Sequence, residues 1–286
     1  MRRATGYPIC ATPEQALGTV IDPGRVSGGA VAAPVFWGSA SFAFLNFGLP
    51  VYTRQLGADA IEIGGMFTVF TLTLLIVRPI VGWALDRMGR RWFFLAAFAF
   101  YAVAMGVFSR ADDIVDFYIA RLLQGFGASL MWITARTIIA DVVPSEIRGE
   151  EMGRLTQRSV QGSIVFGFYG FTLLARLPDA RAWEAAVGGY AGCALIGFVI
   201  AWRVPETADT PQARGARSSI GPAVRRLMAV FALSGFASSL IEPIYLIFLQ
   251  DKFELPFTVI AAAFFPAGIV LSLIHISEPT RLHCIS

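Results

Sequence analysis

Long apolar runs separated by short polar segments fill the chain from about residue 33 onward. Each run holds roughly 18–24 residues, enough for a helix to cross the ~30 Å hydrocarbon core of a bilayer. A further run begins near Phe257 and still continues at Val270. The pattern predicts a polytopic helical membrane protein whose complete spans cover about 33–53, 63–85, 92–109, 117–140, 160–178, 184–203 and 227–250.

The placement of basic residues predicts the orientation of these spans. If the N-terminus is cytoplasmic, the inner segments contain 14 arginines and the outer loops contain five basic residues. Inner loops of membrane proteins carry the excess of Lys and Arg, so this bias predicts a cytoplasmic N-terminus. The first 30 residues lack the apolar core of a cleaved signal peptide, and we expect them to form a flexible tail.

The amino-acid composition argues against a soluble domain, a nucleic-acid-binding protein and a metal site. Hydrophobic residues make up 56% of the chain and charged residues 15%, whereas about a quarter of a soluble domain is charged. The net charge of +3 is too small to indicate nucleic-acid binding. Cys10, Cys193 and Cys284 have no metal-ligand or disulfide spacing, so we expect neither a metal nor a cofactor.

A polar, basic segment follows the sixth span. RVPETADTPQARGARSSIGPAVRR, residues 203–226, is rich in Pro and Gly and predicts a cytoplasmic linker between two helical bundles. Pro50-Val51-Tyr52 near the end of the first span is echoed by Pro243-Ile244-Tyr245 near the end of the seventh. The echo favours two halves related by an axis along the membrane normal, although so short a match is also compatible with chance.

The loop between the second and third spans carries the most specific motif. GWALDRMGRR resembles the signature loop of the major facilitator superfamily at every fixed position. The resemblance implies a cytoplasmic gating motif, in which Gly82 permits close helix approach, Gly89 forms a tight turn and Asp86 pairs with an arginine or a helix N-terminus. The alternative is a generic basic turn at the inner surface. The motif residues are Gly82, Asp86, Arg87, Gly89, Arg90 and Arg91.

A second match lies early in the fourth span. RLLQGFGAS, Arg121–Ser129, resembles the fourth-helix pattern of the same family, which implies that Arg121 and Gln124 serve substrate binding or proton coupling. Snorkelling of Arg121 to the outer surface is the alternative. RVPET at 203–207 and ARTIIADVVPSEIRGE at 135–150 also resemble the family, whereas GSIVFGFYG at 162–170 lacks the Gly-Pro pair that its antiporters often carry in helix five.

Other polar residues within the spans are further candidates. Arg78 and Arg136 lie near inner helix ends, where, with Asp141, ion pairing or snorkelling is favoured over substrate contact. Glu242 either carries a proton in an apolar setting or ends a helix at the outer interface. Asn46 is a candidate for substrate contact on the first span.

The resemblance implies an all-α membrane protein with the major facilitator fold. We expect a complete N-terminal six-helix bundle and the first one to two helices of the C-terminal bundle, in the cytoplasmic (inner) membrane of a bacterial cell. The full-length protein is expected to be monomeric. The expected organisation is a cytoplasmic tail at 1–30, the six-helix bundle at 31–204, a basic linker at 205–225, the start of the second bundle at 226–270 and a terminal segment at 271–286.

The expected activity is secondary active transport of a small molecule by alternating access, driven by a proton gradient and exporting drugs or sugars. Proton-coupled uptake of a small metabolite, or a receptor or scaffold with a transporter-like fold, stays open. An enzyme is not expected, because the sequence has no histidine before His275, no paired cysteines and no HExxH motif. The expected partners are the substrate and the lipid bilayer, and no nucleic acid.

The last residues interrupt the eighth apolar run. LSLIHISEPTR, which begins at Leu271, is the translation of a DNA sequence that resembles the transposon end and adapter of tagmentation libraries. We therefore expect the natural sequence to stop at or near Val270 and assign no role to His275, His283 or Cys284. A natural polar C-terminus is the alternative. With under two helices of the second bundle, we expect this chain not to transport.

A long read of the source DNA across the codon for Val270 tests this expectation. We expect the reading frame to continue into further apolar runs. Genomic DNA that encodes SLIHISEPTR would contradict the adapter origin.

Overall fold

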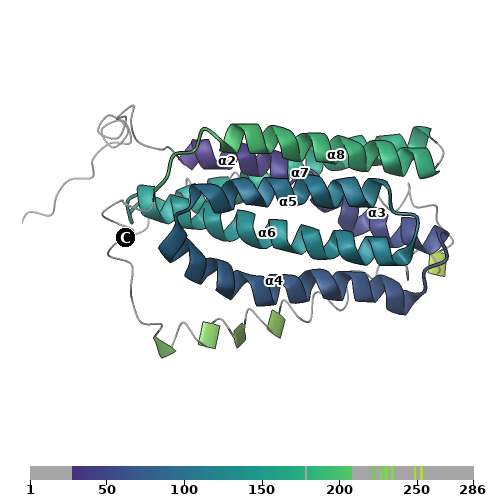
Figure 1. Ribbon diagram of the computed structural model, residues 1–286, viewed down its shortest axis with the longest axis horizontal. Helices are drawn as coiled ribbons and strands as arrows, with labels where there is room; N and C mark the ends of the chain where they lie inside the picture. The colour runs from purple at the N-terminus through teal and green to yellow at the C-terminus, as the bar shows by residue number, and fades with distance from the viewer. Residues whose placement is uncertain are drawn as a thin grey trace, which may run out of the picture.

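The computed structural model describes residues 28–177 and 179–207, and residues 221–222, 226–227, 229–230, 233–234, 248 and 252–253 of the later chain. In the first two ranges the chain forms helices and no strand, and the long helices lie side by side (Figure 1). The predicted all-α fold is therefore confirmed. The helices are α2 (Gly28–Gly38), α3 (Phe42–Gln55), α4 (Ala60–Met88), α5 (Arg91–Ser109), α6 (Ile114–Val142), α7 (Arg148–Arg176) and α8 (Asp179–Ala201).

Five of the predicted spans, the second to the sixth, each form one helix, α4 to α8. Four helical stretches among the described residues are long and apolar enough to cross a membrane: 28–55, 60–88, 91–109 and 180–201. Helices α6 and α7, which correspond to the predicted spans 117–140 and 160–178, are not among these four. The predicted seventh and eighth spans lie almost wholly outside the described residues.

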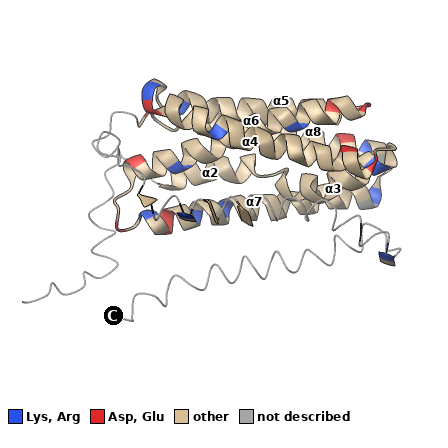
Figure 2. Cartoon of the chain, turned by 90° about the horizontal axis from the view of Figure 1, so that it is seen from below, with Lys and Arg blue, Asp and Glu red and all other residues tan. Residues whose placement is uncertain are grey.

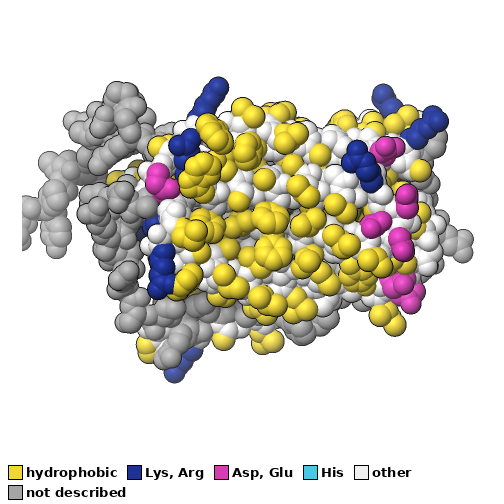
Figure 3. Space-filling view, viewed as in Figure 1, with side chains coloured by type: hydrophobic (Ala, Val, Ile, Leu, Met, Phe, Trp, Pro, Cys, Tyr) yellow, Lys and Arg dark blue, Asp and Glu magenta, His cyan; other side chains and the backbone are white. Residues whose placement is uncertain are grey.

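Charged side chains gather at the two ends of the helical bundle. Figure 2 shows most of the Lys, Arg, Asp and Glu residues toward either end of the helices, with few between them. Figure 3 shows that hydrophobic side chains cover the face between those ends. Large apolar residues such as Leu75, Ile76 and Val199 are exposed there. A lipid-facing surface explains this exposure, because hydrocarbon is a good solvent for these side chains.

The first predicted span, 33–53, is not one continuous helix. Residues 39–41 form a turn between α2 and α3. The Ser163 hydroxyl accepts a hydrogen bond from the backbone N–H of Ala43 at 2.9 Å, and the hydroxyls of Ser39 and Ser159 lie 2.7 Å apart. Backbone groups inside a membrane need internal partners. Ser163 of α7 supplies one for the backbone of Ala43, turn hydrogen bonds such as that from Phe42 N–H to the carbonyl of Ser39 supply others, and Ser159 holds the side chain of Ser39.

Two clusters of buried apolar residues hold the helices together. One cluster, around Phe94, Phe98 and Met131, lies toward the α4–α5 loop, and the other surrounds Trp183 at the opposite end. The Trp183 indole donates a hydrogen bond to the carbonyl of Phe108 at 2.8 Å, and its ring stacks on Tyr52 at 4.3 Å. The indole N–H is thus satisfied, which allows so large a side chain to be buried.

Helix α6 packs against both α4 and α5. Its two closely spaced glycines face different neighbours. A Cβ atom at Gly125 would lie 2.7 Å from the Cβ of Thr73 on α4, and one at Gly127 would lie 3.1 Å from the carbonyl of Ala97 on α5. Small residues allow this close packing of membrane helices. The glycines of the RLLQGFGAS motif therefore have a packing role that is separate from the role of its arginine.

We expect Gly125→Ala to destabilise the bundle by about 1–3 kcal/mol, because the added methyl group overlaps Thr73 and forces α4 and α6 apart. Thermal unfolding of the purified 286-residue chain in detergent measures the effect. Gly192→Ala on α8 is the matched control, since a Cβ there meets no described atom within 4 Å. Equal melting temperatures for the two variants would contradict the packing role.

Candidate functional site

The loop between α4 and α5 turns at a glycine that no other residue can replace without strain. Gly89 has φ +89°, a backbone conformation that residues with a side chain rarely adopt. A Cβ atom there would also lie 2.6 Å from a carboxylate oxygen of Glu206. The tight turn expected at Gly89 is present, and it places the first residues of α5 against the end of α8.

A buried ion pair joins this loop to α6. The Nε atom of Arg90 donates to Oδ2 of Asp141 at 2.9 Å, and its NH1 donates to the carbonyl of Leu85 at 2.9 Å. Arg90 and Asp141 are each 5% exposed. The hydroxyl of Thr207 also donates to Asp141 Oδ2, at 3.1 Å. Extra hydrogen bonds of this kind are what a buried pair needs to offset its desolvation.

Glu206 binds the N-terminus of α5. Its carboxylate accepts hydrogen bonds from the backbone N–H groups of Arg90 at 2.8 and 2.9 Å and of Arg91 at 3.0 Å. Arg91 in turn donates from its side chain to the carbonyl of Trp202, the first residue after α8, at 2.9 Å. A carboxylate at a helix N-terminus satisfies free N–H groups and the helix dipole. The RVPET segment resembles the family, but this role of Glu206 was not predicted from it. The signal that could have indicated the role is a glutamate directly after a proline at the end of a helix.

We call Arg90, Asp141, Glu206 and Thr207 the inner latch. Its members come from the α4–α5 loop, from α6 and from the residues after α8. Arg90 contacts both carboxylates, Asp141 through its side chain and Glu206 through its backbone. Thr207 does the same, because its hydroxyl donates to Asp141 and its backbone N–H donates to Glu206 at 2.9 Å. The inner latch therefore ties the ends of four helices to one another.

Two residues of the gating motif do not take the roles expected for them among the described residues. Asp86 is exposed and makes no hydrogen bond or ion pair there. A Cβ atom at Gly82 would meet no described atom within 4 Å, so no close helix approach occurs at that glycine. Arg87 lies over the ring of Trp83, 3.9 Å from its centroid. The side of α4 that carries Gly82 and Asp86 thus faces away from the other described helices.

Arg121 lies inside the bundle, toward the opposite end of α6. It is 1% exposed, and its NH1 donates to the side-chain oxygen of Gln124 at 2.9 Å. Its guanidinium carbon lies 4.3 Å from the ring centroid of Phe67 and 5.4 Å from that of Phe70, both on α4. Its Nε and NH2 atoms have no hydrogen-bond partner among the described residues. The burial shows that Arg121 does not snorkel to the surface. Among the described residues, its positive charge is balanced by the amide of Gln124 and the rings of Phe67 and Phe70.

Ion pairing or snorkelling was expected for Arg78 and Arg136, with Asp141 as a further ion-pair candidate. Asp141 pairs with Arg90 instead, because the α4–α5 turn carries Arg90 under the end of α6. No carboxylate of the described residues lies within 4.0 Å of Arg78 or Arg136. Both arginines line one cavity between α4 and α6, together with Trp132 and Ile133. Neither arginine makes an ion pair within the described part of the chain, and the expectation of ion pairing or snorkelling stays a prediction for both.

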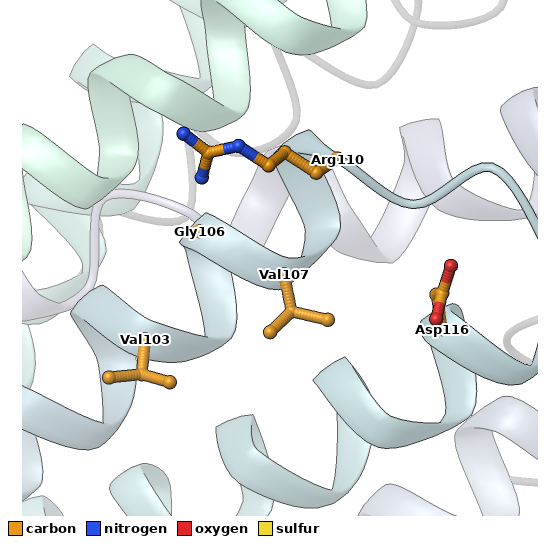
Figure 4. A pocket seen from close by; sticks show the side chains of 5 residues that line it. All are labelled: Val103, Gly106, Val107, Arg110 and Asp116. Carbon is orange, nitrogen blue, oxygen red and sulfur yellow. The ribbon is translucent and has the colours of Figure 1, made fainter.

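The two remaining candidate residues, Asn46 and Glu242, are not part of the sites described above. Asn46 on α3 is exposed, on the outer surface of the described bundle. Glu242 lies outside the described residues. A second cavity, at the end of α5 and the start of α6, contains none of the predicted site residues. Figure 4 shows its lining: Val103, Gly106, Val107, Arg110 and Asp116.

Comparison with known proteins agrees with the fold and the motifs. A Bacillus subtilis (strain 168) protein, "Multidrug resistance protein 1", is 25% identical over 224 residues, which cover 74% of this chain and 56% of that protein. The chain thus spans about half the length of this relative.

Solved structures show the same fold at low identity. The human organic anion transporter MFSD10 superposes with a TM-score of 0.66 at 18% identity, over 91% of this chain and 74% of that one. A D-xylose-proton symporter superposes with a TM-score of 0.61 at 15% identity, over 85% and 65%. The family model "Major Facilitator Superfamily" matches residues 34–277. The chain therefore belongs to the Major Facilitator Superfamily.

Proposed function

We propose that this chain is part of a secondary active transporter that moves a small molecule by alternating access and exports drugs or sugars in exchange for protons. The observation that carries the proposal is the inner latch. Alternating access is largely a rigid-body motion of one bundle against another around a central site. By tying α4, α5, α6 and α8 at one end, the inner latch allows the first bundle to move as one body.

The relatives support particular parts of this proposal. The Bacillus subtilis relative is a multidrug resistance protein, which favours export. The symporter that shares the fold couples xylose to protons, which is compatible with a sugar substrate and a proton gradient. Proton-coupled uptake of a metabolite is the second candidate. The domain boundaries given above, a cytoplasmic N-terminus and a monomeric full-length protein are parts of the same proposal.

The proposed coupling site contains Arg121 and Gln124. Two nitrogen atoms of Arg121 have no partner among the described residues and can donate hydrogen bonds. We propose that a substrate, or a carboxylate of the second bundle, accepts them. Asn46 and Glu242 are proposed as additional contacts. The inner latch is proposed to lie on the cytoplasmic side, because the Arg-rich loops gather at that end.

Transport by a full-length protein that contains this chain tests the proposal. We expect everted membrane vesicles that contain it to accumulate ethidium or labelled xylose when a proton gradient is present, and to lose the signal when a protonophore is added. The 286-residue chain, assayed beside it, is expected to accumulate neither. Accumulation that persists without a gradient would contradict secondary transport.

Loss of the buried ion pair is expected to loosen the bundle. Arg90→Gln and Asp141→Asn each leave one buried charge without its partner, which costs about 3–5 kcal/mol. Chemical unfolding of the purified chain measures the loss, and the full-length protein with the same substitution is expected to transport more slowly.

Arg154→Gln is the matched control for that prediction. Arg154 pairs with Glu150 and Glu151 on the surface of α7 at 2.7 and 2.6 Å, with its own side chain 59% exposed. An exposed pair contributes about 0–1 kcal/mol, so the control should lose little stability. Equal losses for Arg90→Gln and Arg154→Gln would show that the inner latch has no special role.

A further inference from the structure

We propose that Arg78 and Arg136 form a binding site for the negatively charged group, a carboxylate or a phosphate, of an organic anion. This inference names a substrate class, and in that respect it rests on the proposed transport function. The site is the cavity between α4 and α6, separate from the inner latch and from Arg121.

The shape of the cavity fits a small organic molecule. Its volume is about 350 Å³, and it is lined by Arg78 from α4 and by Trp132, Ile133 and Arg136 from α6. Pockets that hold small ligands have volumes of about 300–1,000 Å³. Both arginines are exposed to the cavity side of the bundle rather than packed into the core. The cavity is therefore open to a ligand and presents two cationic side chains to it.

The charges in this cavity are unbalanced. The positive charge of Arg136 acts unfavourably on that of Arg78, so the two guanidinium groups repel each other. Residues 63–85 of α4 and 117–140 of α6 contain no Asp or Glu. Asp141, one turn beyond Arg136, is held by Arg90 in the inner latch. A bound anion would relieve the repulsion, because it attracts both arginines at once.

Neighbouring groups add recognition beyond charge. Tyr101 of α5 lies within electrostatic reach of Arg78, and its hydroxyl is buried without a hydrogen-bond partner among the described residues. The guanidinium carbon of Arg136 lies 5.4 Å from the ring centroid of Trp132, which also lines the cavity. An aromatic face beside two cations suits a ligand that has an apolar or aromatic body and one anionic group.

A lipid headgroup carries the same chemistry as a phosphate-bearing substrate. Arg78 lies ten residues before the end of α4 and Arg136 six residues before the end of α6, which are depths of about 15 and 9 Å at 1.5 Å per residue. A long side chain at such a depth can reach toward the interface. The charge repulsion is relieved by either source of anion, so the experiment must distinguish them.

Equilibrium binding of labelled benzoate to the purified 286-residue chain in phosphatidylcholine nanodiscs tests the proposal. Benzamide, a neutral molecule of nearly the same shape, is the comparison ligand. We expect benzoate to bind saturably and benzamide not to bind at this site. Arg78→Gln and Arg136→Gln should each weaken benzoate binding about tenfold, because each removes one charge-assisted contact.

Two further variants control for unfolding and for nonspecific charge effects. Arg136→Lys keeps the positive charge and should keep more of the benzoate affinity than Arg136→Gln. Arg110→Gln removes an arginine from the other cavity and should leave binding unchanged. Melting temperatures of all variants show whether a loss of binding is a loss of fold.

Equal binding of benzoate and benzamide, or benzoate binding that neither substitution affects, would overturn the proposal. A separate arm measures phosphatidylglycerol that is retained during purification. If its retention depends on both arginines and benzoate does not bind in phosphatidylcholine discs, the anion is a lipid headgroup, and the substrate assignment fails. Binding is measured without a gradient, so benzoate binding by this chain together with no transport by the full-length protein would count against the proposed function alone.

Discussion

The pairing of Arg90 with Asp141 is the interaction on which the end of this bundle that carries the α4–α5 loop depends. Arg90 lies at the one point where the α4–α5 turn, the end of α6 and the residues after α8 meet. Its side chain neutralises a buried carboxylate, while its backbone donates to a second carboxylate, that of Glu206. Gly89 makes this possible, because a side chain at that position would occupy the space of Glu206. One glycine and one arginine thus fix how four helices end.

The arginines of the described helices differ in how their charge is balanced. Arg90 has a carboxylate and a carbonyl within hydrogen-bond distance. Arg121 is equally buried but has an amide and two aromatic rings. Arg78 and Arg136 share a cavity and have no carboxylate among the described residues. A buried charge is costly unless it is paired, so the pairing of Arg90 serves structure. Arg121, Arg78 and Arg136 have no carboxylate partner among the described residues, so they are the positions where an anionic ligand would gain most.

Much of the fold could be predicted from the sequence, since length and apolar composition alone define a membrane helix. The second, third, fourth and sixth spans were located to within about five residues, whereas α7 begins twelve residues before the predicted fifth span. The turn at Gly89 followed from its motif. The break at residues 39–41 could not be predicted, because it depends on Ser159 and Ser163, which are 120 residues away along the chain.

The partners of the charged residues were harder to predict than the helices. Asp141 was recognised as a candidate, but its partner was expected among the intramembrane arginines rather than in the α4–α5 loop. Pairing depends on which helix ends meet in space, and apolar periodicity does not contain that information. Motif spacing placed Arg121 and Gln124 one turn apart, and their hydrogen bond follows from helix geometry alone.

The interrupted first span has a consequence for the electrostatics of the bundle interior. A continuous membrane helix places both ends of its dipole at the two water interfaces. The turn at residues 39–41 instead brings the negative end of α2 and the positive end of α3 together at mid-depth, beside the hydroxyls of Ser159 and Ser163. This stretch contains no charged side chain between Gly28 and Thr53. The backbone itself therefore supplies a local field in a region whose side chains are mostly apolar.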